Sequence, residues 1–183
     1  MMKIKNLIVG PLLTNCYILT SNKEAIVVDP GAELDKILKE LKEKKLKYII
    51  LTHYHWDHVL AAPKLREKKG GKILIHEKEK EFLKFKVDKF LKGDEVIKIG
   101  KETLKIIHTP GHSKGSISIL GKNFIFTGDV IFEDGFGRCD LPGGSEKEMK
   151  ETLEKLEKII QKGIKIYPGH GAPFFKKEFF KKK

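Results

Sequence analysis

One short stretch decides how the rest of this chain is interpreted: residues 53–58 read HYHWDH. It places three histidines and one aspartate directly after a short apolar run. Imidazole and carboxylate groups are ligands for zinc and other borderline divalent metals. A strand that ends in a loop lets alternate side chains converge on one ion, whereas a helix would splay them. We therefore interpret four residues as metal ligands rather than as a solvent-exposed polar turn: His53, His55, Asp57 and His58.

Three further candidate ligands each follow a glycine. They are His112 after Gly111, Asp129 after Gly128 and His170 after Gly169. Each pair lies close to an apolar run, and glycine permits a tight turn that swings the next side chain over the edge of a sheet. Alone, each pair is a weak signal, because a Gly-Asp is most often an ordinary turn. With the first cluster the pairs give seven ligands, about the number that two adjacent metal ions need.

Taken in order, these motifs resemble those of the metallo-β-lactamase superfamily. The resemblance covers essentially the whole chain and rests on residues 52–58 (THYHWDH), 109–113 (TPGHS), 127–129 (TGD), 168–171 (PGHG) and 29–31 (DPG). It implies an α+β fold, a four-layer αβ/βα sandwich of two mixed sheets with helices outside. It also implies that residues 1–183 form a single hydrolase domain.

The resemblance further implies how the ligands divide between two metal ions. The first ion would be held by His53, His55 and His112. The second ion would be held by Asp57, His58 and His170. Asp129 would bridge the two ions. Asp57 would also be the catalytic residue that orients the attacking hydroxide. The expected cofactors are two divalent ions, zinc in the first place, with iron or manganese as alternatives because these ligand types suit all three.

A second motif narrows the expected chemistry. Residues 137–144 read GRCDLPGG and, following FTGDVIF at 126–132, are similar to the short bacterial and archaeal glyoxalase II-like proteins. Those proteins resemble hydroxyacylglutathione hydrolase, so the resemblance implies hydrolysis of a thioester of the S-lactoylglutathione type. Only residues 171–183 follow the last ligand. We therefore expect no C-terminal helical glutathione-binding domain of the kind that full-length glyoxalase II has.

Three side chains near the ligands are candidate substrate contacts: Tyr54, Phe136 and Arg138. Arg138 is one of two arginines in a lysine-rich chain, which suggests that a guanidinium fork is needed there. Its first interpretation is a pairing with Asp140, and its second is contact with a substrate carboxylate. Phe136 forms either an apolar wall beside the cleft or part of the core. Trp56 has packing beneath the site as its first interpretation and contact with the substrate as its second.

Three residues near the motifs have plainer interpretations. His76 and His108 lie outside the motifs and are taken as ordinary strand-end residues. Ser113 either supports His112 through a hydrogen bond or caps a turn.

Rival functions use the same residues differently. A persulfide dioxygenase holds one iron with two histidines and an aspartate, for which His53, His112 and Asp129 would suffice. Hydrolysis of a β-lactam or a lactone would use both metals. A metal-stabilised binding module that exploits the net charge of +12 is the non-enzyme alternative. Loss of a ligand would favour that module, and no ligand is lost.

The composition agrees with a folded cytoplasmic protein. Apolar residues make up 40% of the 183 residues and charged residues 34%. Lysines are mixed with glutamates along the chain, and only residues 181–183 form a pure basic block, so we expect a solvated surface and no nucleic-acid partner. No apolar run approaches the roughly 20 residues that span a bilayer, so no membrane partner is expected. Cys16 and Cys139 form no CxxC pattern, which agrees with a reducing compartment. The expected partner is a small-molecule thioester substrate.

Apolar spacing predicts two strand-rich halves, each followed by helix. In the first half we expect a hairpin near the N-terminus, a helix from about residue 34, a strand at 48–51, a helix at 59–68 and a strand at 72–76. In the second half we expect strands at 95–99, 103–108, 116–120, 123–127 and 164–167. A capping box of Ser145 and Glu148 should open a helix that Gly163 ends.

Overall fold

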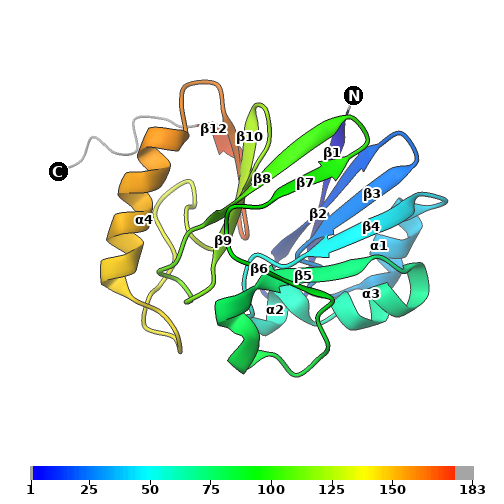
Figure 1. Cartoon of the computed structure of the whole chain (residues 1–183), viewed down its shortest axis with the longest axis horizontal. Coiled ribbons are helices and arrows are strands. Elements are labelled where there is room, and N and C mark those ends of the chain that lie inside the picture. Colours follow the sequence, from blue (N-terminus) through cyan, green and yellow to red (C-terminus); the bar gives the residue numbers. More distant parts are fainter. Residues whose placement is uncertain (1, 176–183) are drawn as a thin grey trace.

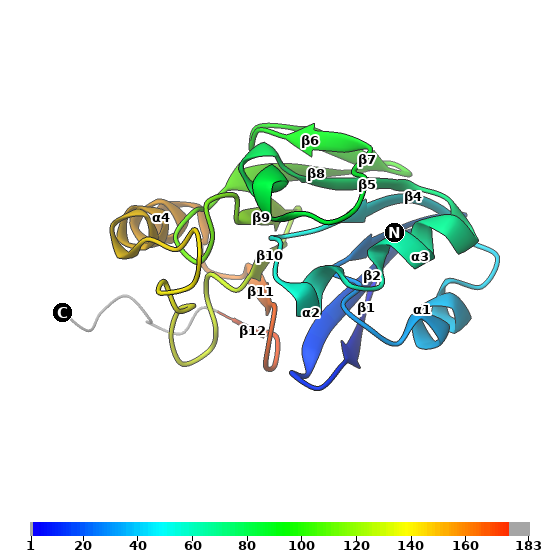
Figure 2. The same cartoon turned by 90° about the horizontal axis from the view of Figure 1, so that it is seen from below.

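Two six-stranded mixed sheets pack against each other in this protein, whose computed structural model describes residues 2–175. Helices α1, α2 and α3 lie on the outer side of the first sheet, and α4 lies on the outer side of the second (Figures 1 and 2). This arrangement confirms the predicted α+β, four-layer αβ/βα sandwich. The basic block at 181–183 lies outside the described residues. Within residues 2–175, no helix combines the length and apolar character needed to cross a membrane.

The first half of the chain forms one sheet and its three covering helices. Its strands run in the order β1-β2-β3-β4-β5-β6, antiparallel through β3 and parallel from β3 onward. The elements are β1 (Lys3–Val9), β2 (Thr14–Ser21), β3 (Glu24–Val28), α1 (Leu34–Leu41), β4 (Lys45–Ile50), α2 (Trp56–Val59), α3 (Ala62–Lys69), β5 (Lys72–His76), the 3-10 helix η1 (Glu77–Phe82) and β6 (Lys89–Leu91). The expected N-terminal hairpin is β1 and β2.

The second half forms the other sheet and α4. Its strands run in the order β12-β11-β10-β9-β8-β7. The elements are β7 (Val96–Ile99), β8 (Glu102–His108), β9 (Ile117–Leu120), β10 (Phe124–Gly128), α4 (Glu146–Ile159), β11 (Lys165–Pro168) and β12 (Phe174–Phe175). The five predicted strands of this half are confirmed within a residue or two. The two-residue strand β12 and the three-residue strand β6 are too short to show an alternating pattern, and neither was predicted.

The helix expected at 59–68 was placed too early. Two separate helices occupy this stretch, because α2 ends at Val59 and α3 begins at Ala62 with a proline in its first turn. Proline suits the first turn of a helix, where its missing N–H is not needed. The prediction that the metal-binding stretch is a loop was also partly wrong, since Asp57 and His58 lie within α2.

Alternation along the strands explains why the layers hold together. In β2 and β3, side chains of one parity, such as Leu19 and Ile26, join the apolar core between the two sheets. Those of the other parity, such as Ile18 and Val27, face α1 and α3. Successive strand residues point to opposite faces, so buried strands covered on both sides are apolar throughout. A third core joins the second sheet to α4 through residues such as Met149.

Only half of the predicted capping box forms at the start of α4. The Ser145 hydroxyl accepts a hydrogen bond from the Glu148 N–H at 3.2 Å, as expected. The Ser145 N–H, however, donates to the carbonyl of Gly111 at 2.8 Å instead of to the Glu148 side chain. This bond attaches the start of α4 to the turn that carries His112.

Gly31, after β3, packs directly against the backbone of Asp57 and His58 in α2. A Cβ added there would collide with the carbonyl oxygen of Asp57. We expect Gly31→Ala to push α2 outward and to lower the free energy of unfolding by about 1–3 kcal/mol, the usual cost of overpacking. Urea denaturation monitored by circular dichroism measures this.

The matched control is Gly135→Ala, because an added Cβ there has no neighbour within 4 Å. We expect its unfolding midpoint to equal that of the wild type. Equal midpoints for both variants would show that α2 moves aside at no cost.

Candidate metal centre

All seven predicted ligands gather at one edge of the sandwich, although they come from both sheets. The first sheet supplies the stretch that follows β4, and α2 continues it. The second sheet supplies the remaining three ligands, which follow β8, β10 and β11 respectively: His112, Asp129 and His170. The structure thus brings together residues up to 117 positions apart in sequence, from His53 to His170.

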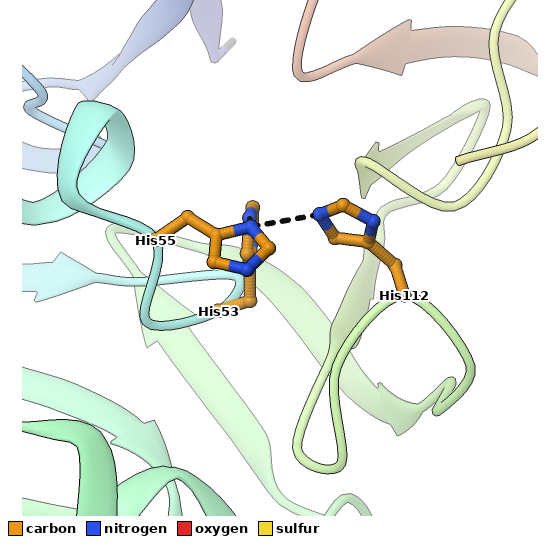
Figure 3. Close-up of side chains that lie close together, drawn as sticks. All are labelled: His53, His55 and His112. Atoms are coloured by element: carbon orange, nitrogen blue, oxygen red, sulfur yellow. Dashed lines mark hydrogen bonds between the residues drawn. The ribbon is translucent and has the colours of Figure 1, made fainter. Parts of the chain in front are cut away.

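Three histidine rings form the first group. The Nδ1 atom of His55 lies 3.0 Å from Nε2 of His53 and 2.9 Å from Nε2 of His112. Figure 3 shows His55 and His112 pointing toward each other from two separate segments. Zinc bonds to nitrogen of 2.0–2.1 Å imply nitrogens about 3.3 Å apart around a tetrahedral ion. The three nitrogens converge to within a few tenths of an ångström of this spacing, so they fit one metal ion after a small outward shift.

One carboxylate and two histidines form the second group. The Oδ2 atom of Asp57 lies 3.3 Å from Nε2 of His58 and 3.3 Å from Nε2 of His170. The two ring nitrogens are themselves 3.3 Å apart. These three atoms therefore offer a second, separate set of ligands.

Asp129 lies between the two groups. Its Oδ2 is 3.6 Å from Nε2 of His112 and 3.4 Å from Nε2 of His170, and its Oδ1 is 3.4 Å from Nε2 of His58. Among the described residues, Oδ1 is buried without a hydrogen-bond partner. A buried carboxylate oxygen left in this state is costly unless a cation takes it. Asp129 thus lies where a bridging ligand would lie, and the donor set fits two divalent ions.

Burial and mutual charge set the protonation of the cluster. Burial, reinforced by the charge of His112, lowers the pKa of His55 to about 4, and burial also lowers the pKa values of His53 and His112. The first group therefore presents neutral imidazoles, the form that binds metals.

The second group contains both a positively charged histidine and a negatively charged carboxylate near neutral pH. Burial opposes both shifts, yet hydrogen bonds to Asp129 and Asp57 raise the pKa of His170 to about 9, and the bond to His170 helps to lower the pKa of Asp57 to about 2. Without metal, protons on the histidines balance these carboxylates. A divalent cation would take over that role.

Two supporting residues had no role assigned from the sequence. Asp29 accepts hydrogen bonds from the N–H and the hydroxyl of Thr52 at 2.7 and 2.6 Å, and its Oδ2 lies 3.0 Å from Nδ1 of His58. Thr14 donates its hydroxyl proton to Oδ2 of Asp57 at 2.7 Å. Asp29 belongs to the quoted DPG motif, so a signal for it existed. Thr14 gives none, because its partner is 43 residues away.

The glycines before His112, Asp129 and His170 were expected to permit tight turns, and two of the three have a backbone conformation that favours glycine. Gly111 and Gly128 have φ of 139° and 51°, which side chains disfavour. Gly169 is not among the residues with positive φ, so this part of the prediction was wrong. Position 169 favours glycine for a steric reason, because a Cβ there would collide with Oδ1 of Asp129.

The candidate substrate contacts lie around the metal ligands with their own partners. The Tyr54 hydroxyl donates to the carbonyl of Pro142 at 2.8 Å. Arg138 forms the two-bond pairing with Asp140, at 2.7 Å for each bond, while its backbone carbonyl lies 2.8 Å from Nδ1 of His112. Phe136 is 57% exposed and so is not part of the core.

The expectation that Trp56 packs beneath the site was wrong. Its side chain is 53% exposed, while Asp57 and His58 are buried. The cause is α2: successive residues of a helix point about 100° apart, so the two ligands turn inward and Trp56 outward. His76 and His108 do end β5 and β8, and their rings stack on each other with centroids 4.1 Å apart.

One hollow is lined by a predicted ligand, and a second is lined by two of the candidate substrate contacts. A hollow of about 620 Å³ lies beside His170 and is lined also by Phe132 and Ala172. A groove of about 940 Å³ runs between α4 and the segment 136–140, which includes Arg138. Either is large enough to receive part of a small-molecule substrate.

Comparison with known proteins identifies the family. The sequence profile of the metallo-β-lactamase superfamily matches residues 9–170. The chain therefore belongs to the metallo-β-lactamase superfamily, as the motifs predicted.

Individual relatives agree with this. The chain is 33% identical to the probable metallo-hydrolase YqgX of Bacillus subtilis, over 93% of this chain and 90% of that protein. It is 30% identical to the hydroxyacylglutathione hydrolase GloC of Haemophilus influenzae, over 93% of this chain and 92% of that protein. The crystal structure of the BLEG-1 B3 metallo-β-lactamase matches with a TM-score of 0.88 and 29% identity, covering 94% and 93% of the two chains. These relatives support the broader prediction of a metal-dependent hydrolase.

The two-group arrangement makes a prediction about metal content. His170 belongs only to the second group, so His170→Ala should release that ion and keep the first. After dialysis against metal-free buffer, inductively coupled plasma mass spectrometry should find two ions per wild-type chain and one per variant chain.

A histidine outside the groups provides the control. His76→Gln should keep both ions, because His76 lies at the end of β5 and belongs to no ligand group. Two tightly held ions in the His170→Ala protein would contradict the assignment of the second group.

Proposed function

We propose that this protein hydrolyses a thioester of the hydroxyacylglutathione type at a two-metal centre. The observation that carries the proposal is the pair of ligand groups joined by Asp129, in a chain that is similar to GloC along most of its length. When bound, the two cations would supply a hydroxide nucleophile at neutral pH and polarise the thioester carbonyl. A thiolate leaves readily, so the chain needs no strong general acid.

The chain's own contribution is to hold and orient. Thr14 bonds to Oδ2 of Asp57, which limits rotation of that carboxylate and fits its expected part in orienting the nucleophile. The exposed Phe136 and the guanidinium of Arg138 lie on the segment that follows Asp129 and leads past His112. We assign this segment to the thiol half of the substrate, with Arg138 toward a carboxylate of that half. Tyr54 is the third proposed contact, through its ring, since its hydroxyl bonds to Pro142.

Hydrolysis of a β-lactam is the second candidate. It is favoured by the likeness to the BLEG-1 B3 metallo-β-lactamase, with a TM-score of 0.88. A persulfide dioxygenase with one iron is less well supported, because its three ligands would leave the group of Asp57, His58 and His170 without a function.

A direct comparison of substrates tests the proposal. The purified protein, with its metals quantified, is assayed with S-lactoylglutathione, a β-lactam and glutathione persulfide. We expect release of glutathione from the first, with two ions per chain. Oxygen consumption with the persulfide and one iron per chain would overturn the proposal, and turnover of the β-lactam alone would support the second candidate.

Arg138 tests the assignment of the thiol half. In Arg138→Ala we expect the KM for S-lactoylglutathione to rise about tenfold with kcat retained, because a charge-assisted hydrogen bond contributes about 1.5–3 kcal/mol and the pairing with Asp140 uses part of the guanidinium. The measurement is steady-state kinetics on the metal-loaded enzyme.

The other arginine is the matched control. Arg66 bonds to Asp88 on the helical side of the first sheet, away from the ligands. Arg66→Ala should leave both kinetic constants unchanged. An unchanged KM in Arg138→Ala would restrict Arg138 to its pairing with Asp140.

A further inference from the structure

One buried carboxylate outside the ligand set contacts both segments that carry the first metal group. Glu79 lies in η1 and is fully buried. Its Oε2 accepts a hydrogen bond from the Tyr54 N–H at 3.0 Å. Its Oε1 accepts one from the Ser113 hydroxyl at 2.8 Å and another from the Gly115 N–H. One side chain thus bonds to two segments that are far apart in sequence.

The bonded positions are the immediate neighbours of ligands. Tyr54 lies between His53 and His55, and Ser113 follows His112. All three histidines of the first group are therefore one residue away from a hydrogen bond to Glu79. The second group has its own supports, Thr14 and Asp29, and neither of them contacts Glu79.

The surrounding chain makes room for this carboxylate. A Cβ on Gly115 would lie 2.6 Å from both Cγ and Oε1 of Glu79, so a side chain at 115 would displace it. Within the described residues, no ion pair involves Glu79. A buried carboxylate without a cation is expensive unless hydrogen bonds satisfy it. Keeping such a group beside the ligands indicates a role in holding them.

We propose that Glu79 is a positioning residue for the first metal group: it fixes the distance between the His53–His55 stretch and His112, and so raises the affinity for the ion held there. The two segments belong to different sheets, and Glu79 joins them next to the ligands themselves. This inference rests on the two-metal use of the site and is independent of the substrate.

The expected effect is on one ion only. Loss of a partner that orients metal ligands typically costs 10–100-fold in affinity. Glu79 acts through the backbone and through Ser113 rather than on a ring nitrogen, so we expect about a tenfold loss for the first ion in Glu79→Ala, at the lower end of that range. The affinity for the second ion should remain that of the wild type.

Cobalt titration resolves the two ions. The metal-free full-length protein is titrated with Co²⁺ in competition with a chelator of known affinity, while the visible absorption bands report each coordination environment. Glu79→Ala, Glu79→Gln and Ser113→Ala are compared with the wild type. Glutamine has the shape of glutamate but turns an NH₂ group toward one of the donors, so it should also weaken the first ion.

Glu81 provides a matched control. It lies in the same 3-10 helix and reaches the same loop through Lys114 at 2.8 Å, but both side chains are mostly exposed. Exposed ion pairs contribute little to stability. Glu81→Gln should therefore bind both ions as the wild type does.

The results separate positioning from mere stability. A lower affinity for the first ion in Glu79→Gln or Ser113→Ala, in protein with an unchanged circular dichroism spectrum, supports the proposal. These two variants decide the outcome if Glu79→Ala does not fold. Wild-type affinity for both ions, or an equal loss of both, overturns it. Because no substrate enters this measurement, it stands whether or not the protein hydrolyses thioesters.

Discussion

The candidate metal centre depends on a fixed relative position of the two sheets at the edge where its residues meet. Four ligands belong to the first half of the chain and three to the second, so a small slide of one sheet over the other would separate them. Polar bonds across the seam oppose this. The Ile117 N–H donates to the Thr52 carbonyl at 2.9 Å, the Asn15 N–H to the Gly169 carbonyl at 2.7 Å, and the Tyr17 hydroxyl to the Pro168 carbonyl at 2.6 Å. Each bond joins the two sheets within one or two residues of a predicted ligand. The first ends beside His53, and the other two end one and two residues before His170.

Apolar packing and these polar bonds have different tasks. The core between the sheets supplies non-directional stabilisation through side chains such as Leu19 and Phe126. Such a core tolerates small shifts, whereas metal ligands do not, because metal–ligand distances are confined to narrow ranges. Directional hydrogen bonds therefore accumulate where the core ends. Asp29 shows this, since one carboxylate holds both Thr52 and His58.

Separation along the chain determines which features the sequence predicts. Features that lie within a short motif were predicted, and contacts between distant residues were not. The gathering of the seven predicted ligands was predictable because each lies in a short motif, and the sheets were predictable because alternation is local. The supporting contacts were not, since Thr14 meets Asp57 across 43 residues and Glu79 meets Ser113 across 34. The wrong placement of Trp56 has a different cause: α2 is a single turn, too short to show a helical period, yet long enough to reverse which side chains face inward.

The same geometry explains why the metal site alone does not determine the substrate. The backbone carbonyl of Arg138 lies against Nδ1 of His112, so the segment after Asp129 helps to hold a ligand. Its side chains point elsewhere, with Phe136 largely exposed and the Arg138 guanidinium on Asp140. Backbone and side chains of one segment thus serve separate ends. Substitution of the side chains at 136 and 138 would leave the backbone carbonyl of residue 138 available to His112, and one fold can carry different activities in this way.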